Sequence, residues 1–421
     1  MPEVRTRSRW WVTALAVVGA LSLIAGVVGV GVVGVRWLAF RSADEQRATS
    51  QSAFYSAPES IPPTPGTIIR SEPLEYSVVG GRGFRVVYTS LDSAGVPIAV
   101  SGRIFLPDTP APAGGRRVLA WAHGTVGLAA SCAPSGATSY TTTGWLEPAL
   151  QRGWVVTATD YAGLGMPGPS TYLVGGQEAR DVVNSVRAAR AFAGSAAGAD
   201  WVVFGASQGG HAALWTAHEA ARLAPELRLR GVAAAVPAAE LAAIMTVQWH
   251  TVVGWVIGPD ALSGWRIAHP DRDFEAALSE SGRNQAATLS SLCVADGAVS
   301  ALVLNTVKGS FFEANPLTDP AWSATVEEET PPPPPAGMPM FLAQGMADKV
   351  VLAGSNALLQ NTWCPQGVTI TSLWLPTMSH QNTSIVAGPA VVNWAADRFA
   401  GAPAVSTCSL GVPAPVSPLP R

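Results

Sequence analysis

Charge is scarce in this 421-residue chain, and lysine is almost absent. Charged residues make up 13% of the sequence, the formal net charge is −3, and lysine occurs only at Lys308 and Lys349. A protein that binds nucleic acid carries a basic patch or stripe, and no run of Lys or Arg occurs here. The composition therefore predicts no nucleic-acid partner. With 48% hydrophobic residues, the chain can still bury a large core.

Cysteine is also rare, and its spacing excludes the common metal motifs. The four cysteines are Cys132, Cys293, Cys364 and Cys408, with no C-x-x-C pair and no His/Cys cluster. The sequence therefore predicts no metal and no cofactor. In an oxidising compartment an even number of cysteines predicts two disulfides, and three pairings are open.

One long stretch, residues 10–35, contains no charged residue. As a helix it is long enough to cross the hydrocarbon core of a bilayer. Arg5, Arg7 and Arg9 precede it, so the positive-inside rule keeps the N-terminus in the cytoplasm and exports the remainder. The prediction is an extracytoplasmic protein with a membrane anchor in residues 1–41. A cleaved signal peptide, which would release a secreted protein, is the alternative.

Short apolar strands alternate with helical patterns over residues 66–237. Runs such as residues 117–122 (RVLAWA) and 154–159 (WVVTAT) are typical of strands buried on both faces, whereas residues 176–192 have a helical pattern. This alternation predicts an α/β fold with a mostly parallel central sheet and helices on both faces. Residues 42–65 are rich in Pro and Ser and are predicted to be a linker or loosely wrapped lead-in.

The pattern changes at residues 238–335, where helical stretches contain no clear strand and end in five consecutive prolines. Strand-like runs resume at residues 340–343 and 368–375. A helical segment inserted into an α/β sheet is typical of a cap domain. The predicted core therefore comprises residues 66–237 and 336–415, and a second independent domain is the alternative.

Residues 205–209 read GASQG, a G-x-S-x-G pattern centred on Ser207. An apolar strand precedes the pattern and a helix follows it, which is the local structure of a nucleophile elbow. Such a turn exposes the serine hydroxyl above the sheet. The backbone N–H of Gln208, at the start of the helix, can face a developing oxyanion. Ser207 is therefore the predicted nucleophile.

A serine nucleophile needs a base and an acid, and in this kind of fold the acid precedes the histidine. His380, in LPTMSHQNT, follows the last predicted strand, and Asp348, in FLAQGMADKVV, lies in the loop after the preceding strand. These positions predict a Ser207–Asp348–His380 triad. Asp160 ends an earlier strand and is the alternative acid if the order differs. Glu329 and its two acidic neighbours are interpreted as a solvated charge cluster.

The second oxyanion donor is expected in the loop after the third strand, which reads HGTVG at residues 123–127. Its glycines allow the backbone to approach a substrate closely. A donor between Thr125 and Gly127 is therefore predicted, and His123 is expected to order the loop by hydrogen bonds. His211, on the helix after the predicted nucleophile, is interpreted as a structural residue.

Several further motifs accompany these residues: FYSAP, PGTIIRSEPL, YTSLDSAGVPIAVSGRIFLP, SCAPS and DYAGLG. In this order with HGTVG, GASQGG, GMADKVV and SHQN, they resemble the secretory lipase family of α/β-hydrolases, which includes the fungal lipase A type. The resemblance spans roughly residues 53–410. It implies an α/β-hydrolase fold, a helical cap over an acyl pocket, and the same three catalytic residues.

The resemblance also implies the disulfides Cys132–Cys293 and Cys364–Cys408. In the fungal type an acidic residue shortly before the SCAPS-like cysteine would supply an oxyanion donor. The corresponding GTVGLAAS contains no acid. A backbone N–H is the remaining source of that hydrogen bond.

The predicted function is an exported serine ester hydrolase, a lipase or carboxylesterase, that cleaves apolar acyl esters through an acyl-enzyme. Apolar cap stretches such as residues 244–257 are expected either to line an acyl tunnel or to form the core of the cap. An acyltransferase with the same triad and a non-catalytic membrane-tethered module are the alternatives. The expected partners are a lipid or ester substrate and, through residues 10–35, a membrane.

Overall fold

The computed structural model describes residues 53–138 and 143–417 of the chain. The predicted span at residues 10–35 lies outside these residues, as does the rest of the predicted anchor. Within the described ranges, no helix combines the length and the apolar character that a membrane crossing requires.

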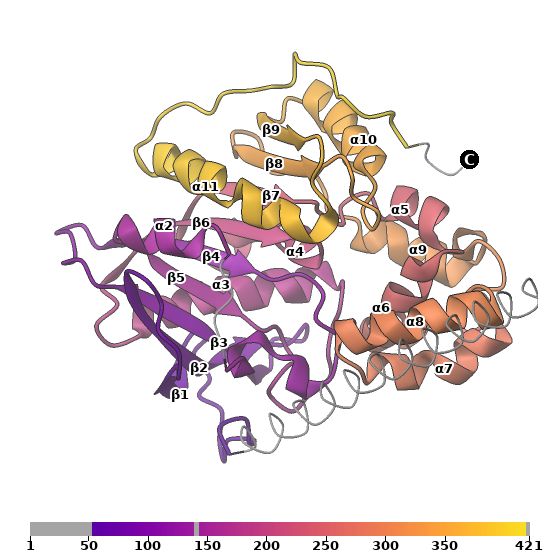
Figure 1. Ribbon diagram of the computed structural model, residues 1–421. Coiled ribbons are helices and arrows are strands. Elements are labelled where there is room, and N and C mark those ends of the chain that lie inside the picture. Colours follow the sequence, from indigo (N-terminus) through magenta and orange to yellow (C-terminus); the bar gives the residue numbers. More distant parts are fainter. Residues whose placement is uncertain (1–52, 139–142, 418–421) are drawn as a thin grey trace, which may run out of the picture. The chain divides into compact units, whose positions relative to one another are not determined.

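A nine-stranded, mostly parallel sheet organises the described residues (Figure 1). Its strands, in chain order, are β1 (Ile68–Pro73), β2 (Gly81–Leu91), β3 (Pro97–Pro107), β4 (Arg116–Ala122), β5 (Val155–Thr159), β6 (Ala197–Ala206), β7 (Arg228–Ala235), β8 (Met340–Gly345) and β9 (Ile370–Leu375). Their order across the sheet is β1-β2-β3-β5-β4-β6-β7-β8-β9. The pairs from β1 to β5 are antiparallel, and those from β5 to β9 are parallel. The predicted α/β class is confirmed.

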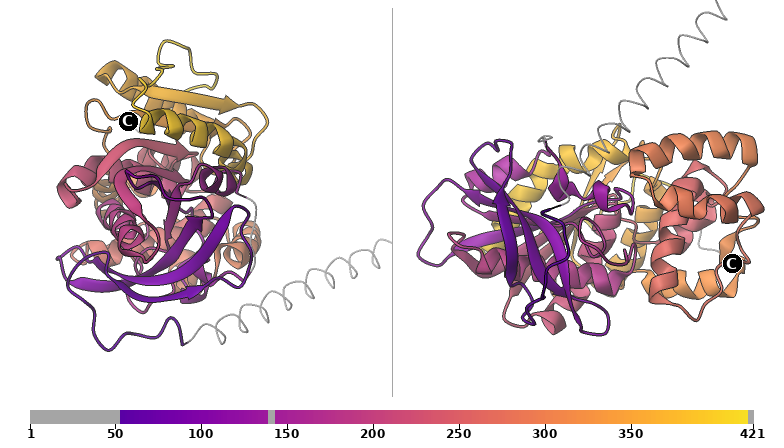
Figure 2. Two further views of the ribbon diagram at one scale, coloured as in Figure 1. Left: turned by 90° about the vertical axis from the view of Figure 1, so that its left-hand side faces the viewer. Right: turned by 90° about the horizontal axis from the view of Figure 1, so that it is seen from below.

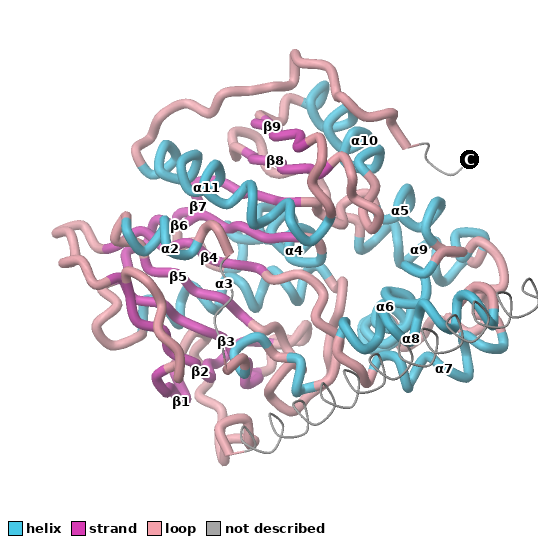
Figure 3. Tube along the Cα trace, viewed as in Figure 1, coloured by secondary structure: helices cyan, strands magenta, loops and turns pink. Residues whose placement is uncertain are grey.

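Helices cover both faces of this sheet (Figures 2 and 3). One face carries α3 (Gly175–Ala191), α4 (Gln208–Leu223) and α10 (Ala353–Trp363), and the other carries α2 (Leu146–Gln151) and α11 (His380–Phe399). Within β4, Val118 and Ala120 join the apolar cluster on the first face, whereas Leu119 joins the cluster on the second. Both faces of β4 are therefore buried, which is why RVLAWA reads as one continuous apolar run.

The chain leaves the sheet after β7 and returns to the neighbouring strand β8 through a helical insertion, residues 238–335 (Figure 1). Its α-helices are α5 (Leu241–Gln248), α6 (Val252–Ala268), α7 (Glu280–Ser290), α8 (Val294–Lys308) and α9 (Pro320–Glu329). Aromatic rings form its core, and the rings of Phe312 and Trp322 meet edge to face with centroids 4.9 Å apart. The insertion is therefore packed around an apolar centre, which Tyr172 and Leu173 from the segment before α3 also join.

Two features of the N-terminal part are not evident from sequence patterns. β1 contains the polar run Arg70–Glu72, which lacks the alternation of a strand, and its backbone is held by pairing with β2. Phe54 and Tyr55, in the predicted linker, are buried, and the Tyr55 hydroxyl hydrogen-bonds with Ser135 Oγ at 2.7 Å. Both features depend on partners that are distant in sequence, so local composition does not reveal them.

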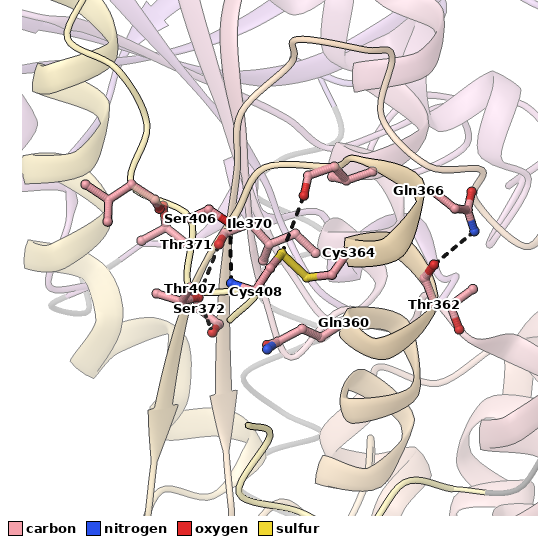
Figure 4. The surroundings of a disulfide bond; sticks show 12 residues. Gln360, Thr362, Cys364, Gln366, Ile370, Thr371, Ser372, Ser406, Thr407 and Cys408 are labelled. Carbon is pink, nitrogen blue, oxygen red and sulfur yellow. Dashed lines mark hydrogen bonds between the residues drawn. A yellow bond between two sulfur atoms is a disulfide. The ribbon is translucent and has the colours of Figure 1, made fainter. Parts of the chain in front are cut away.

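Two disulfides connect distant segments. Cys132–Cys293 joins the loop after β4 to the residue that precedes α8. Cys364–Cys408 attaches the C-terminal segment to the end of α10, where the backbone N–H of Thr407 donates to the carbonyl of Ile370 at 2.8 Å (Figure 4). These are the two pairings that the resemblance implies.

Candidate active site

Ser207 lies on a strained turn between β6 and α4. Its backbone has φ 57° and ψ −118°, which residues other than glycine rarely adopt. A Cβ on Gly205 would lie 1.8 Å from the carbonyl oxygen of Gly209, and a Cβ on Gly209 would lie 1.9 Å from that of Ala122. Glycine is therefore required at both flanking positions of the G-x-S-x-G pattern. The Ser207 side chain makes no capping hydrogen bond to α4, so the helix does not occupy its hydroxyl.

Asp348 and His380 are joined by a hydrogen bond. Oδ2 of Asp348 lies 2.7 Å from Nδ1 of His380, and Oδ1 accepts from the backbone N–H groups of Val350 and Val351 at 2.8 and 3.0 Å. The aspartate side chain is buried, whereas that of His380, the first residue of α11, is 12% exposed. A proton on Nδ1 leaves Nε2 free to accept a second one.

Ser207 and His380 line the same cavity, of about 600 Å³, which we call the open cavity. Thr125, from the loop after β4, forms part of its wall, and Val256 and Leu302 contribute from α6 and α8. The structure thus brings together residues that follow β6, β8 and β9. Their order along the chain does not say how close they lie. They come together because the parallel strands that precede them end at the same edge of the sheet.

A second cavity, of about 90 Å³, is also lined by Ser207, and we call it the narrow cavity. Residues of α5 and α6, among them Leu241, Met245 and Ile257, form much of its apolar wall. Trp322 of α9 lines it as well. Ser207 therefore lies where the open cavity, which His380 also lines, meets the narrow cavity, which residues of the helical insertion line.

Of the three predicted oxyanion donors, Gln208 and Thr125 lie beside Ser207. Gln208 is the first residue of α4, where the backbone N–H has no acceptor within the helix. Thr125 lines the open cavity beside Ser207, and a Cβ on the preceding Gly124 would lie 3.4 Å from Ser207 Cβ. Gln208 and Thr125 are thus placed next to the serine from two sides.

Gly127 is occupied in a different contact. It forms an isolated antiparallel bridge with Cys293, and a Cβ at this position would lie 2.2 Å from the carbonyl oxygen of Leu292. Gly127 does not line the open cavity among the described residues. Glycine is required here because the loop packs closely against the helical insertion.

His123 and Asp160 order the loops next to the site. The two ring nitrogens of His123 lie 2.7 and 3.2 Å from the carbonyl oxygens of Gly124 and Asp160, and burial lowers the pKa of the ring. The Asp160 carboxylate accepts from Ser101 Oγ at 2.7 Å and from the backbone N–H of Ser135 at 3.0 Å. Asp160, the alternative acid, is therefore engaged with serines, whereas His380 contacts Asp348.

Sequence reasoning missed a buried polar cluster behind Ser207. Glu178 Oε2 lies 2.8 Å from His211 Nδ1, and both side chains are at most 1% exposed. The interpretation of Glu329 as a solvated acid was wrong, since its carboxylate is buried and accepts from the backbone N–H of Gly175 at 2.8 Å. A run of three acids does not show which member faces the protein. The partners lie on separate helices, so no local signal identifies them.

Comparisons with known proteins address the family of the chain. Residues 133–407 match the family model described as "Secretory lipase". The chain belongs to the secretory lipase family. This secretory lipase is 28% identical over 407 residues to Lipase 6 of Candida albicans, with 88% of this chain and 86% of the relative covered. It is 24% identical over 371 residues to Lipase A of Arthroderma benhamiae, with 81% and 74% covered.

Solved structures show the same fold. The secretory lipase matches Candida antarctica lipase A in its closed state with a TM-score of 0.65 and 20% identity, covering 87% of this chain and 90% of that one. It matches the rice cell wall degrading esterase LipA from Xanthomonas oryzae with a TM-score of 0.62 and 18% identity, covering 80% and 99%. The fold is that of an α/β-hydrolase, as predicted. Together with the family and its named lipases, this makes the chain a lipase-like carboxylic ester hydrolase.

Proposed function

We propose that the chain hydrolyses esters of apolar acyl chains, with Ser207 as nucleophile, His380 as general base and Asp348 as the residue that orients the base. The observation that carries this proposal is the 2.7 Å hydrogen bond between Asp348 and His380 at a cavity that Ser207 also lines. Ser207 and His380 line the same cavity, and Asp348 is hydrogen-bonded to Nδ1 of His380.

The proposed reaction has two halves. His380 Nε2 takes the proton of Ser207 Oγ as this oxygen attacks the ester carbonyl carbon, and the imidazolium then protonates the departing alcohol. In the second half His380 deprotonates a water molecule that attacks the acyl-enzyme. The proton returns to Ser207 as the carboxylic acid product leaves.

The backbone N–H groups of Gln208 and Thr125 would hold the oxyanion of both tetrahedral intermediates. Their positions on two sides of Ser207 support this assignment. Loss of one such donor reduces kcat by about 10²–10³-fold in enzymes of this kind. A backbone donor also suits a loop that contains no acidic residue.

We propose that the helical insertion acts as a cap and that the narrow cavity holds the acyl chain. Its apolar wall, including Leu241 and Met245, would stabilise each buried methylene group by about 0.8 kcal/mol. The open cavity beside His380 would then receive the alcohol part of the ester and the attacking water. This assignment predicts a preference for apolar acyl groups and a broad tolerance for alcohols.

The Ser207→Ala variant tests the nucleophile. Hydrolysis of p-nitrophenyl butyrate should fall by about 10⁴-fold or more, because no other group forms the acyl-enzyme. A fluorophosphonate probe should label the wild-type protein and not the variant. Ser93→Ala, a change at an exposed serine between β2 and β3, is the control and should retain activity and labelling. Retained hydrolysis in a folded Ser207→Ala protein would refute the proposal.

The Ala261→Phe variant tests the acyl site. Ala261 is buried on α6 and lines the narrow cavity, so a phenyl ring there should shorten it. Across a ladder of p-nitrophenyl esters, kcat/KM for long acyl chains should fall about tenfold or more, while butyrate hydrolysis should change little. Ala261→Val, which adds less volume, should give a smaller shift in the same direction. An equal loss at every chain length would contradict the assignment.

We further propose that the protein works outside the cytoplasm. Its family is secretory, and two disulfides persist best in an oxidising compartment. The membrane anchor at residues 10–35 stays a prediction from the sequence. Membrane fractionation of the full chain and of a variant lacking residues 1–52 tests it. An anchor predicts that only the full chain sediments with membranes after a carbonate wash.

A further inference from the structure

The Glu178 carboxylate lies behind the nucleophile turn and faces three hydrogen-bond donors. Oε1 accepts from Gln208 Nε2 at 2.8 Å and from the backbone N–H of Leu173 at 3.1 Å. Oε2 lies 2.8 Å from His211 Nδ1. The Glu178 side chain is 1% exposed, so these protein donors take the place of water.

His211 has oxygen atoms at both ring nitrogens. Nδ1 faces Glu178, and Nε2 lies 2.7 Å from the backbone carbonyl oxygen of Glu329. A neutral imidazole carries one N–H, so it can donate to one of these oxygens only, whereas an imidazolium donates to both. The His211 side chain is fully buried, and this geometry favours the charged ring paired with the Glu178 carboxylate.

The electrostatic surroundings of His211 also favour the charged ring. Burial alone lowers the pKa of His211, but the charge and hydrogen bond of Glu178 and the Glu329 contacts outweigh it, so the pKa is raised. The titratable groups that face the ring are Glu178 from α3 and Glu329 from α9. Beyond them, His269 at the end of α6 lies 3.1 Å from Glu329 Oε1.

Besides His211, Glu178 accepts hydrogen bonds from Gln208 and Leu173, and both of these residues line the narrow cavity. Gln208 is the proposed oxyanion donor, and its side chain points away from the substrate to the carboxylate. Leu173 has a positive φ of 51°, a strained conformation for this residue type. Its N–H donates to Glu178, and its carbonyl accepts from Trp265 Nε1 at 3.0 Å. The carboxylate thus fixes two parts of the cavity wall at once.

We propose that Glu178 and His211 form a buried ion pair that positions Gln208 and Leu173 for the reaction. The pair acts through the first residue of α4, whose backbone N–H faces the oxyanion, and through the wall that holds the acyl chain. Glu178 and His211 are therefore positioning residues, and the inference rests on the proposed function. The pair also joins the nucleophile helix to the helical insertion, because His211 donates to Glu329 at the end of α9.

The Glu178→Gln variant is the first test. It keeps the shape of the side chain but removes the charge and one acceptor, so kcat should fall about tenfold through a misplaced oxyanion donor, with KM for butyrate nearly unchanged. Glu219→Gln on α4, which removes a surface pair with Arg222, is the matched control and should keep wild-type kcat. If Glu178→Gln folds and keeps kcat within twofold, the inference is overturned.

The Gln208→Met variant covers the case in which Glu178→Gln does not fold. It keeps the length of the side chain and the backbone N–H and loses only the contact with Glu178. A fall in kcat of about tenfold with unchanged circular dichroism supports positioning through this contact. Wild-type kcat in Gln208→Met overturns it.

A pH profile separates positioning from a purely structural role. The ion pair is complete below the ordinary pKa of histidine and is lost as pH rises through the raised pKa of His211. The kcat of the wild type should therefore decline on the alkaline side while the protein stays folded, and that decline should be absent in His211→Gln, whose kcat is low throughout. An identical alkaline decline in both proteins would overturn the assignment.

These outcomes are distinguishable from failure of the proposed function. Labelling of Ser207 by a fluorophosphonate and loss of activity in Ser207→Ala test the triad alone. If both hold while Glu178→Gln and Gln208→Met retain full kcat, only the positioning role fails. If neither holds, the triad fails first.

Discussion

The sheet core and the helical insertion are stabilised in different ways. The core has one large apolar cluster on each face of the sheet, built from strand residues and the helices that cover them. The insertion has one cluster in which six aromatic side chains pack at angles to each other: Trp255, Trp265, Phe274, Phe311, Phe312 and Trp322. The sheet core is stabilised by regularly spaced apolar residues of strands and helices, whereas the helical insertion is stabilised by packing between large aromatic rings.

The two regions meet through contacts beside the loop after β4, the loop that carries Asp348, and the helix α4 that follows Ser207. Cys293 is joined by a disulfide to Cys132 in the loop after β4, which also carries Thr125. Gln248 Nε2, from α5, donates to the backbone carbonyls of Lys349 and Val350 at 2.9 and 2.7 Å, directly after Asp348. The carbonyl of Glu329, at the end of α9, accepts from His211 Nε2 and Trp215 Nε1 of α4 at 2.7 and 3.1 Å. The core thus carries Ser207, Asp348 and His380, whereas the insertion contacts the segments next to Ser207 and Asp348.

Apart from loss of the nucleophile itself, the largest effect is expected at Asp348, within the core. Asp348→Asn leaves the backbone contacts of the loop in place but prevents the carboxylate from orienting the Nδ1–H tautomer of His380, so kcat should fall about 10³–10⁴-fold. Hydrolysis of p-nitrophenyl butyrate measures the loss, and circular dichroism checks the fold. Asp108→Asn, at an exposed position after β3, serves as the control with unchanged kcat. A loss below tenfold would remove Asp348 from the triad.

The disulfide between the insertion and the core and the disulfide within the core are expected to stabilise the protein by different amounts. Cys132–Cys293 spans 161 residues and Cys364–Cys408 spans 44, so chain entropy predicts stabilisation of about 5 and about 4 kcal/mol as upper estimates. Replacing the first pair by alanine should therefore lower the free energy of unfolding by about 1 kcal/mol more than replacing the second. Urea denaturation measures the difference.

The two disulfides are also expected to differ in their effect on kcat. Loss of Cys132–Cys293 should also reduce kcat, because the bond attaches the insertion to the loop that carries the proposed donor Thr125, whereas loss of Cys364–Cys408 should leave kcat unchanged. Equal kcat in the two double variants would show that the insertion does not align the loop.

A smaller effect is expected at Gln248. Gln248→Leu leaves the carbonyls of Lys349 and Val350 without their donor in a part-buried contact, at a cost of about 1–3 kcal/mol in the free energy of unfolding. A several-fold decrease in kcat should accompany it, since the acid loop loses its contact with α5. Thermal denaturation and butyrate hydrolysis measure both effects. Gln366→Leu, at an exposed position, is the control, and equal behaviour of the two variants would contradict the prediction.

The smallest effect is expected at Glu240, where the chain passes from β7 into α5. Burial raises the pKa of this carboxyl from its ordinary value of 4.5 to about 7. The folded state therefore favours the protonated form, and its stability declines as pH rises from about 4.5 to about 7. Glu240→Gln should raise Tm at pH 8 and leave it unchanged at pH 4.5. Glu280→Gln, an exposed change on α7, should shift Tm at neither pH.

Much of the core could be predicted because its signals are local. The apolar runs that became β4 and β5 and the pattern that became α3 lie within a few residues of their observed bounds, and α4 is the helix expected after Ser207. β1 escaped prediction because its polar residues pair with β2 at an edge of the sheet. For the site, Ser207, Asp348 and His380 could be proposed from the turn chemistry and the chain order that such a sheet imposes.

The element types, the turn at Ser207 and the order of the candidate acid and base follow from the sequence, because periodicity and turn chemistry act over short stretches of chain. That Thr125 lies beside Ser207 while Gly127 packs against Cys293 depends on the three-dimensional packing of the chain. The same packing places Glu178 and His211 together. Contacts between distant polar groups depend on how whole helices pack, and no local pattern records that.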